Sequence, residues 1–179
     1  RIIGYVPETP KLYDYLTGIE YLDFIGEAYG MSPEERKRRI EEFLEAFELK
    51  GRENELISGY SKGMKQKIAL IAALIHKPKI LILDEPLSGL DPRSARIVKD
   101  LIHELAEEGV TTVFSTHILE IADAVCDELA IMYEGMKIAE GRPDELKRMA
   151  GESGSTLEEV FLKLTGAEDV KKIVEALVD

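Results

Sequence analysis

Residues 80–86 read Ile-Leu-Ile-Leu-Asp-Glu-Pro, and this stretch decides the fold class. Four apolar residues without polar alternation predict a strand of a parallel sheet that is buried on both faces. Asp84 and Glu85 follow directly, so both carboxylates lie at the carboxyl edge of the sheet, where α/β proteins bind ligands. Neighbouring side chains on a strand point opposite ways, but a turn here allows both acids to face one site. The same pattern also fits a strand that merely ends in acids.

Strands and helices alternate from this stretch onward, which indicates an α/β sheet core. Asp91-Pro92 opens a helix that runs to about residue 108, and residues 110–115 form the next strand. Glu134-Gly135 predicts the turn of a hairpin. The remaining apolar patterns predict helices over residues 143–150, 157–164 and 170–178.

The region before the strand holds helical patterns only. Thr17, Ser32 and Ser61 are N-cap signals that each precede an apolar stripe with helical spacing. We therefore expect residues 12–77 to form an α-helical subdomain inserted beside the core.

Composition and charge exclude several classes of protein. The chain has 179 residues and a formal net charge of -12, so its surface repels phosphate polyanions and we expect no nucleic-acid partner. A nucleotide site is local and remains compatible with this charge. Cys126 is the sole cysteine, which favours a reducing, cytosolic setting, and its simplest role is that of a small buried residue. No apolar run reaches the ~18 residues that cross a membrane.

Three further motifs carry groups that suit phosphate chemistry. Residues 60–67 place Ser61 and Gly63 at the first turn of a helix, which offers a hydroxyl, backbone N–H groups and the positive end of the dipole to an anion. The turn Ser88–Asp91 comes soon after Glu85, and His117 follows a predicted strand, where it could donate to a phosphate oxygen. Each motif also has a plain structural reading, as an N-cap, surface charges, a turn or a structural histidine.

Taken in order, these motifs resemble those of the ABC ATPase family over residues 1–166. Residues 60–67 look like the ABC signature, residues 80–85 like the Walker B strand, Ser88–Asp91 like the D-loop and His117 like the switch histidine. Residues 3–8 are similar to the Q-loop region, and residues 157–166 to the end of the domain in exporters of the ABC-2 type. The resemblance implies an α/β fold: a P-loop NTPase-like, mostly parallel sheet core with the inserted helical subdomain.

The resemblance also implies a role for each candidate residue at an ATP·Mg²⁺ site shared head to tail by two copies. Asp84 would position Mg²⁺ through its water shell, Glu85 would polarise the attacking water, and His117 would hold the γ-phosphate. Glu8, at the Q-loop position, could reach Mg²⁺ or water. The residues implied to contact nucleotide or to link the two sites are Ser61, Lys62, Gly63, Met64, Ser88 and Asp91.

Three features depart from the family's pattern. The signature reads Tyr60-Ser-Lys-Gly-Met64 where the family has Leu-Ser-Gly-Gly-Gln, and Glu8 stands where the family has Gln. No Gly-x-x-x-x-Gly-Lys-Ser/Thr occurs, although that loop cradles the β- and γ-phosphates in such enzymes. We therefore expect a truncated segment that lacks the N-terminal part of the core and does not hydrolyse ATP unaided.

For the intact protein, the resemblance implies an ATPase subunit that powers export of a substrate across a membrane. The expected organisation is a core strand with the Q-loop region (1–11), the helical subdomain with the signature (12–77), the catalytic core (78–166) and a helical tail (167–179). The expected partners are a second copy of the domain and a transmembrane permease, contacted through the helical insertion and its loop Glu53–Ser58. The expected location is the cytoplasmic face of the cell membrane.

Two alternatives stay open at this point. A soluble ABC-type ATPase of DNA repair or translation shares these motifs but usually carries long insertions, which the compact helical segment does not resemble. A non-catalytic regulatory or dimerising fragment would bind a partner through its helical face. The pair Asp84-Glu85 together with His117 favours an enzyme over that fragment.

Overall fold

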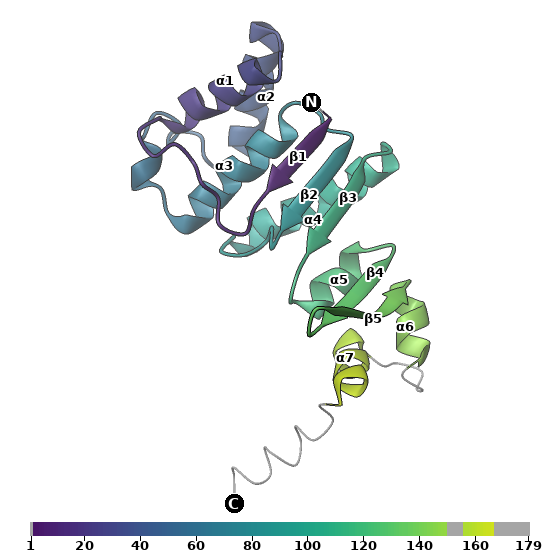
Figure 1. Ribbon diagram of the computed structural model, residues 1–179. Helices are drawn as coiled ribbons and strands as arrows, with labels where there is room; N and C mark the ends of the chain where they lie inside the picture. Colours follow the sequence, from purple (N-terminus) through teal and green to yellow (C-terminus); the bar gives the residue numbers. More distant parts are fainter. Residues whose placement is uncertain (1, 150–155, 167–179) are drawn as a thin grey trace, which may run out of the picture. The chain divides into compact units, whose positions relative to one another are not determined.

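The structure is a computed structural model that describes residues 2–149 and 156–166. The chain divides into two compact units, Arg1–Thr116 and His117–Asp179. The first unit holds the sheet and the helices before and between its strands (Figure 1). Its elements are β1 (Ile3–Val6), α1 (Gly18–Ala28), α2 (Pro33–Ala46), the 3-10 helix η1 (Ile57–Gly59), α3 (Lys62–Leu74), β2 (Ile80–Asp84), α4 (Pro92–Glu107) and β3 (Thr111–Ser115).

The sheet of the first unit is parallel, as the apolar run predicted. Its order is β1-β2-β3, with Ile80 of β2 opposite Ile3 of β1 and Thr111 of β3. In Figure 1 the three strands lie side by side, and α1, α2 and α3 lie beyond β1. Parallel alignment brings the carboxyl ends of all three strands to one edge, which is where Asp84 and Glu85 lie.

The prediction that the strand Ile80–Leu83 is buried on both faces is wrong for the described residues. Leu81 and Leu83 are 1% and 2% exposed, because α3 packs on β1 and α4 packs on β3. Ile82 alternates to the opposite face and is 38% exposed. Its neighbours on that face, Tyr5 and Val113, are each 58% exposed. Helices therefore cover one face of this sheet, while apolar side chains line the other.

Side-chain caps begin the helices where the sequence signals them. Thr17 and Glu20 form a capping box at α1, in which Thr17 N–H donates to Glu20 Oε2 at 2.8 Å. Ser32 caps α2 by accepting from Glu35 N–H at 3.2 Å. The predicted apolar stripe of α2 is confirmed, because Ile40, Leu44 and Phe47 are nearly fully buried.

Polar contacts join the helical region to the sheet and α3. Arg39 of α2 donates to the carbonyl oxygens of Leu74 and Ile75 at the end of α3. His76 stacks on Tyr29 with ring centroids 3.6 Å apart, and its Nε2 lies 3.2 Å from the carbonyl oxygen of Ile3. These contacts hold the helical region against β1, so the helices and the sheet form one compact unit.

The second unit is a small α/β assembly around one hairpin. Its elements are α5 (Leu119–Val125), β4 (Leu129–Tyr133), β5 (Met136–Gly141), α6 (Pro143–Met149) and α7 (Leu157–Thr165). The predicted hairpin is confirmed: β4 and β5 pair antiparallel, and Glu134 and Gly135 have φ angles of 47° and 77°, as a type I′ turn requires. Ile131, Leu146 and Leu157 form the core of the unit.

Three other predictions from the sequence concern Cys126, the end of the chain and membrane-spanning helices. Cys126 is half-buried, so the expectation of a buried residue is only partly met, and burial, followed by the charge of Asp127, raises the pKa of its thiol. The predicted helix over residues 170–178 lies outside the described residues. Within the part of the chain that the structure describes, no helix has the length and apolar character needed to cross a membrane.

Gly4→Ala tests the packing of β1 on α3. A Cβ at Gly4 would lie 2.2 Å from the carbonyl oxygen of Ala73, so the backbone of α3 or β1 must move. We expect a loss of about 2–3 kcal/mol in the free energy of unfolding, measured by urea denaturation. Gly59→Ala is the matched control, because nothing lies within 4 Å of its Cβ. Equal effects of the two substitutions would contradict this packing.

Candidate functional site

Two adjacent carboxylates end the central strand. β2 ends at Asp84, and Glu85 follows with a left-handed φ of 46°. For a residue other than glycine this conformation costs about 1–2 kcal/mol. It interrupts the alternation of the strand, which is the turn that the sequence analysis needed at this position. A strained residue at the ligand-binding edge of a sheet supports a functional role.

The end of β3 orients both carboxylates. Ser115 Oγ donates to Asp84 Oδ1, and Thr116 Oγ1 donates to Glu85 Oε2 at 3.4 Å. The backbone N–H of Glu85 also donates to the carbonyl oxygen of Ser115 at 3.2 Å. Hydroxyl groups orient a carboxylate without adding a positive charge beside it. The sequence analysis assigned no role to Ser115 or Thr116, and their place at the end of a strand parallel to β2 was the available signal.

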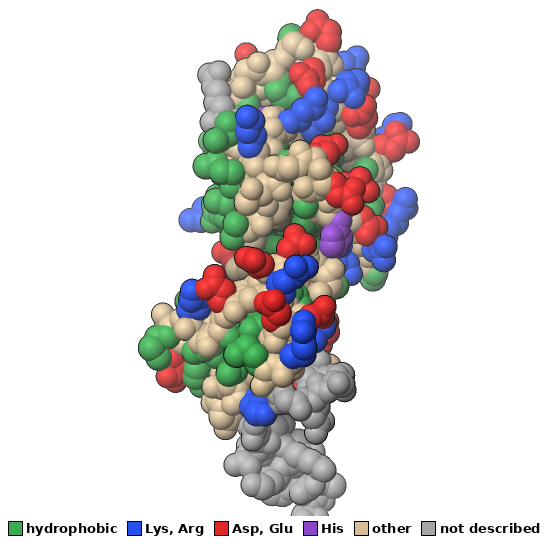
Figure 2. Space-filling view, turned by 90° about the vertical axis from the view of Figure 1, so that its right-hand side faces the viewer, with side chains coloured by type: hydrophobic (Ala, Val, Ile, Leu, Met, Phe, Trp, Pro, Cys, Tyr) green, Lys and Arg blue, Asp and Glu red, His purple; other side chains and the backbone are tan. Residues whose placement is uncertain are grey.

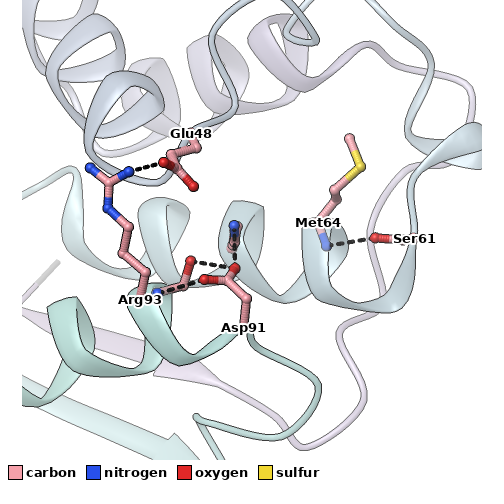
Figure 3. A network of polar contacts seen from close by, with 7 residues as sticks. Glu48, Ser61, Met64, Asp91 and Arg93 are labelled. Carbon is pink, nitrogen blue, oxygen red and sulfur yellow. Dashed lines mark hydrogen bonds and ion pairs between the residues drawn. The ribbon is translucent and has the colours of Figure 1, made fainter.

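The signature turn begins α3. Ser61 caps the helix by accepting from Met64 N–H at 3.2 Å (Figure 3). The structural reading of Ser61 as an N-cap is therefore confirmed. It leaves the anion-binding hypothesis open, because a capping oxygen accepts while its own O–H can donate. Ser61 is exposed, so an anion can reach this helix end.

The signature turn packs on the Ser88–Asp91 turn of the same chain. A Cβ at Gly63 would lie 2.6 Å from the carbonyl oxygen of Gly89, so glycine permits this close approach. Lys62 Nζ donates to Ser88 Oγ at 3.3 Å. The structure thus brings together two motifs that lie more than twenty residues apart.

Asp91 binds Ser94 and Lys67. It caps α4, with Oδ1 accepting from Ser94 N–H at 2.8 Å and Oδ2 accepting from Ser94 Oγ at 2.7 Å and from Lys67 Nζ at 2.8 Å (Figure 3). The bond from Lys67, followed by those from Ser94, holds the pKa of Asp91 well below its usual range. The sequence analysis missed Lys67. Its position four residues after Gly63 and four before Ile71, on a buried helix face, was the available signal.

The other two candidates lie near this edge or outside the first unit. Glu8 is exposed and follows β1, whose carboxyl end shares the edge with β2. His117 directly follows Thr116 in the chain but begins the second compact unit. Among the described residues, no group of three or more His, Cys, Asp and Glu could hold a metal ion. One carboxylate at a phosphate site still fits Mg²⁺, which takes one or two protein carboxylates, retained waters and phosphate oxygens.

Comparisons of the sequence and of the fold with known proteins identify the family of this chain. The chain is 42% identical over 178 residues to an uncharacterized ABC transporter ATP-binding protein, YxlF, of Bacillus subtilis, covering 99% of this chain and 60% of that protein. A solved structure described as the ATP binding subunit of an ABC transporter superposes with a TM-score of 0.85 at 37% identity, covering 92% of this chain and 68% of that one. The chain belongs to the ABC transporter ATP-binding proteins.

Two further comparisons concern the nucleotide and the domain. A dimeric structure of a post-hydrolysis state of the ATP-binding cassette MJ0796, bound to ADP and Pi, has a TM-score of 0.69 at 28% identity, covering 78% of this chain and 62% of that one. A family model described as "AAA domain, putative AbiEii toxin, Type IV TA system" matches residues 14–123. This ABC chain spans 52–65% of the length of the first three curated relatives that it matches.

The surface of this ABC chain is acidic and mixed in sign. Figure 2 shows carboxylates and basic side chains interspersed over one face of the described residues. With a net charge of -12, the protein as a whole does not attract an anionic nucleotide. Any attraction of a nucleotide would have to come from local groups such as the N-terminus of α3.

The Lys67–Asp91 pair has a defined pH dependence. Asp91→Asn keeps a capping oxygen but removes the charge that faces Lys67, and we expect it to lower the free energy of unfolding at pH 7 by ~1 kcal/mol. The pKa of Asp91 is depressed from 3.8 in the folded chain, so this stabilisation is complete above about pH 4 and disappears as the pH falls further. The measurement is urea unfolding of both proteins between pH 3 and 8.

The control for this prediction is Asp100→Asn, which removes an exposed partner of Arg96 at 2.8 Å. That pair should contribute no more than a few tenths of a kcal/mol at any pH. A difference between wild type and Asp91→Asn that does not decrease between pH 4 and pH 3 would contradict the ion pair.

Proposed function

We propose that this chain is the main part of an ATPase that powers a membrane transporter, with ATP·Mg²⁺ bound between two copies head to tail. The observation that carries the proposal is the pair Asp84 and Glu85, held by Ser115 and Thr116 at the carboxyl edge of a parallel sheet. The relatives, which are ABC transporter ATP-binding proteins, and the dimeric structure bound to ADP and Pi support it.

The two carboxylates have different roles in ATP hydrolysis. Asp84 sits where a single carboxylate can hold a hydrated Mg²⁺, which neutralises the charge that develops on the phosphates when it is bound. Glu85 orients an attacking water and accepts its proton, and the hydrogen bond from Thr116 fixes the carboxylate for this task. By the resemblance, His117, which follows Thr116 in the chain, would donate to the γ-phosphate.

The signature turn serves the nucleotide of the second copy. The exposed hydroxyl of Ser61 and the N–H groups of the first turn of α3 face outward at a positive helix end, which suits a γ-phosphate. Gly63 keeps the backbone close to Gly89, and Lys62 is drawn to Ser88. Lys62 therefore acts mainly within its own chain, while Ser61 and the backbone offer the contacts to phosphate.

The 179 residues contain no Gly-x-x-x-x-Gly-Lys-Ser/Thr. Such a loop supplies most of the phosphate contacts and a Mg²⁺ ligand in P-loop enzymes. We therefore propose that these residues do not hydrolyse ATP unless a phosphate-binding loop is joined to them. The direction of transport that the resemblance implies is export.

ATP turnover tests the enzymatic proposal. We expect the 179-residue chain to show no turnover, and a version extended by a phosphate-binding loop to hydrolyse ATP. In the extended version, Glu85→Gln should lower kcat about 10²–10⁴-fold and keep ATP binding, because only the base is lost. The control is Glu107→Gln, an exposed residue of α4 that should leave turnover unchanged. If no form binds ATP, a partner-binding scaffold becomes the better account.

An exposed aromatic surface supports the membrane partner. Tyr13 packs its ring against Tyr15, Tyr21 and Phe24 at centroid distances of 6.0, 5.9 and 5.9 Å. Tyr15 is 76% exposed and Phe24 48% exposed. The predicted contact loop Glu53–Ser58 runs alongside, because Ile57 N–H donates to the carbonyl oxygen of Leu16 and Ser58 N–H to that of Asp14. Exposed clusters of this kind mark protein interfaces.

Charge identifies the kind of partner that fits this aromatic surface. Glu20 and Glu27 flank Phe24 on α1, four positions before it and three after it. An acidic border repels anionic lipid headgroups but attracts the Lys- and Arg-rich cytoplasmic loops of membrane proteins. We infer that a permease contacts this surface and that the chain works at the cytoplasmic face of the membrane.

The double substitution Tyr15→Ser and Phe24→Ser tests this contact. We expect the amount of ATPase retained on membranes that contain the permease to fall at least tenfold, while ATP binding in solution is kept. Tyr133→Ser, on β4 of the second unit, removes a ring that is 39% exposed and should have no effect. Retention that is independent of the two rings would favour a soluble ATPase or a different contact.

A further inference from the structure

Four contacts join the first two turns of α3 to the loop that follows Glu85. Lys62 Nζ donates to Ser88 Oγ, and Gly63 packs on the carbonyl oxygen of Gly89. One turn further along the helix, Gln66 Nε2 donates to the carbonyl oxygen of Pro86 at 3.2 Å and Lys67 Nζ pairs with Asp91 at 2.8 Å. Residues 62, 63, 66 and 67 share one helix face because they are three or four positions apart.

At the two deeper contacts the side chains from α3 are buried, whereas the Asp91 side chain is 44% exposed. Gln66 is 0% exposed and Lys67 8% exposed, so each polar side chain depends on its partner in the loop. Removing either partner leaves a polar group in the interior without its bond. These two contacts therefore hold α3 and the loop in one fixed arrangement more firmly than the exposed Lys62–Ser88 bond does.

The loop itself is compact and starts at the candidate base. Ser88 N–H donates to the carbonyl oxygen of Glu85 at 3.1 Å, and Leu90 N–H to that of Leu87 at 3.2 Å. At its far end Asp91 caps α4. A displacement of α3 is thus passed through Pro86, Ser88 and Asp91 to the backbone of Glu85.

We propose that Gln66 and Lys67 are positioning residues that connect Glu85 to the signature turn of the same chain. Contact between the signature turn and the nucleotide at one site of the dimer then determines the position of the Glu85 base at the other site. This inference rests on the proposed head-to-tail dimer, in which Ser61 serves the partner's nucleotide and Glu85 serves its own. The link between the two sites then runs inside each chain, through Lys67 and Asp91. It does not require Asp91 to reach across the interface.

The test compares Lys67→Met, which removes the charge, with Lys67→Arg, which keeps it, in the complete protein. We expect Lys67→Met to lower kcat at least about tenfold, because small displacements of a positioned group cost this much. KM for ATP should change less than twofold, and the Hill coefficient for ATP should fall to 1, since the sites no longer communicate. Lys67→Arg should recover most of the kcat and of the Hill coefficient.

The matched control is Arg96→Met, which breaks an exposed pair with Asp100 on α4. It should change neither kcat nor the Hill coefficient. A merely structural role for Lys67 predicts a different outcome: Lys67→Met would lower the melting temperature and leave kcat and the Hill coefficient unchanged at a temperature where it is folded. That result would overturn the proposal.

Amide hydrogen exchange separates this inference from the proposed ATPase activity. In Lys67→Met, peptides that cover residues 61–66 and 85–91 should both exchange at least about tenfold faster, and in Arg96→Met neither should change. If Lys67→Met does not fold, Lys62→Met removes the exposed contact and should speed exchange in the same two segments. If the complete wild-type protein hydrolyses no ATP, the proposed function fails, whereas unchanged exchange in residues 85–91 overturns the contact between α3 and the loop itself.

Discussion

The rest of the site depends on the hydrogen bonds between the ends of β2 and β3. Ser115 holds Asp84, and Thr116 holds Glu85, which already adopts a left-handed backbone. The left-handed backbone of Glu85 interrupts the alternation that would send the two carboxylates to opposite sides of the strand, and the two hydroxyl groups then orient them. The parallel register makes the arrangement possible, because it places Ser115 opposite Asp84. From this edge the loop leads through Pro86 and Ser88 to Asp91, and from there back to α3.

Much of this was predictable from the sequence, because it depends on local patterns. The apolar run Ile80–Leu83 predicted the parallel strand, Thr17 and Ser32 predicted helix starts, and Glu134-Gly135 predicted the hairpin. The left-handed conformation of Glu85 was not predictable in detail, although a turn was required. The hydroxyl contacts of Ser115 and Thr116 and the Lys67–Asp91 pair depend on tertiary packing. The position after a strand was the available signal for Ser115 and Thr116, and a charge on a buried helix face was the signal for Lys67.

Where sequence reasoning failed, tertiary cover was the cause. An apolar run predicts a strand buried on both faces, but only neighbouring elements decide whether both faces are covered. In the described residues α3 and α4 cover Leu81 and Leu83, while Tyr5, Ile82 and Val113 line the other face. His76 is a second residue whose role depends on tertiary packing. Nothing in the local sequence distinguished it, yet it joins the helical region to β1 through Tyr29 and Ile3.

The central claim is that each ATP lies between the Glu85 side of one chain and the signature turn of another. The most direct test mixes two inactive variants of the complete protein, Glu85→Gln and Ser61→Arg, under conditions that exchange subunits. A mixed head-to-tail dimer contains one site with both groups intact, so a 1:1 mixture should regain up to about a quarter of wild-type turnover. A mixture that stays as inactive as its two components would contradict the shared site.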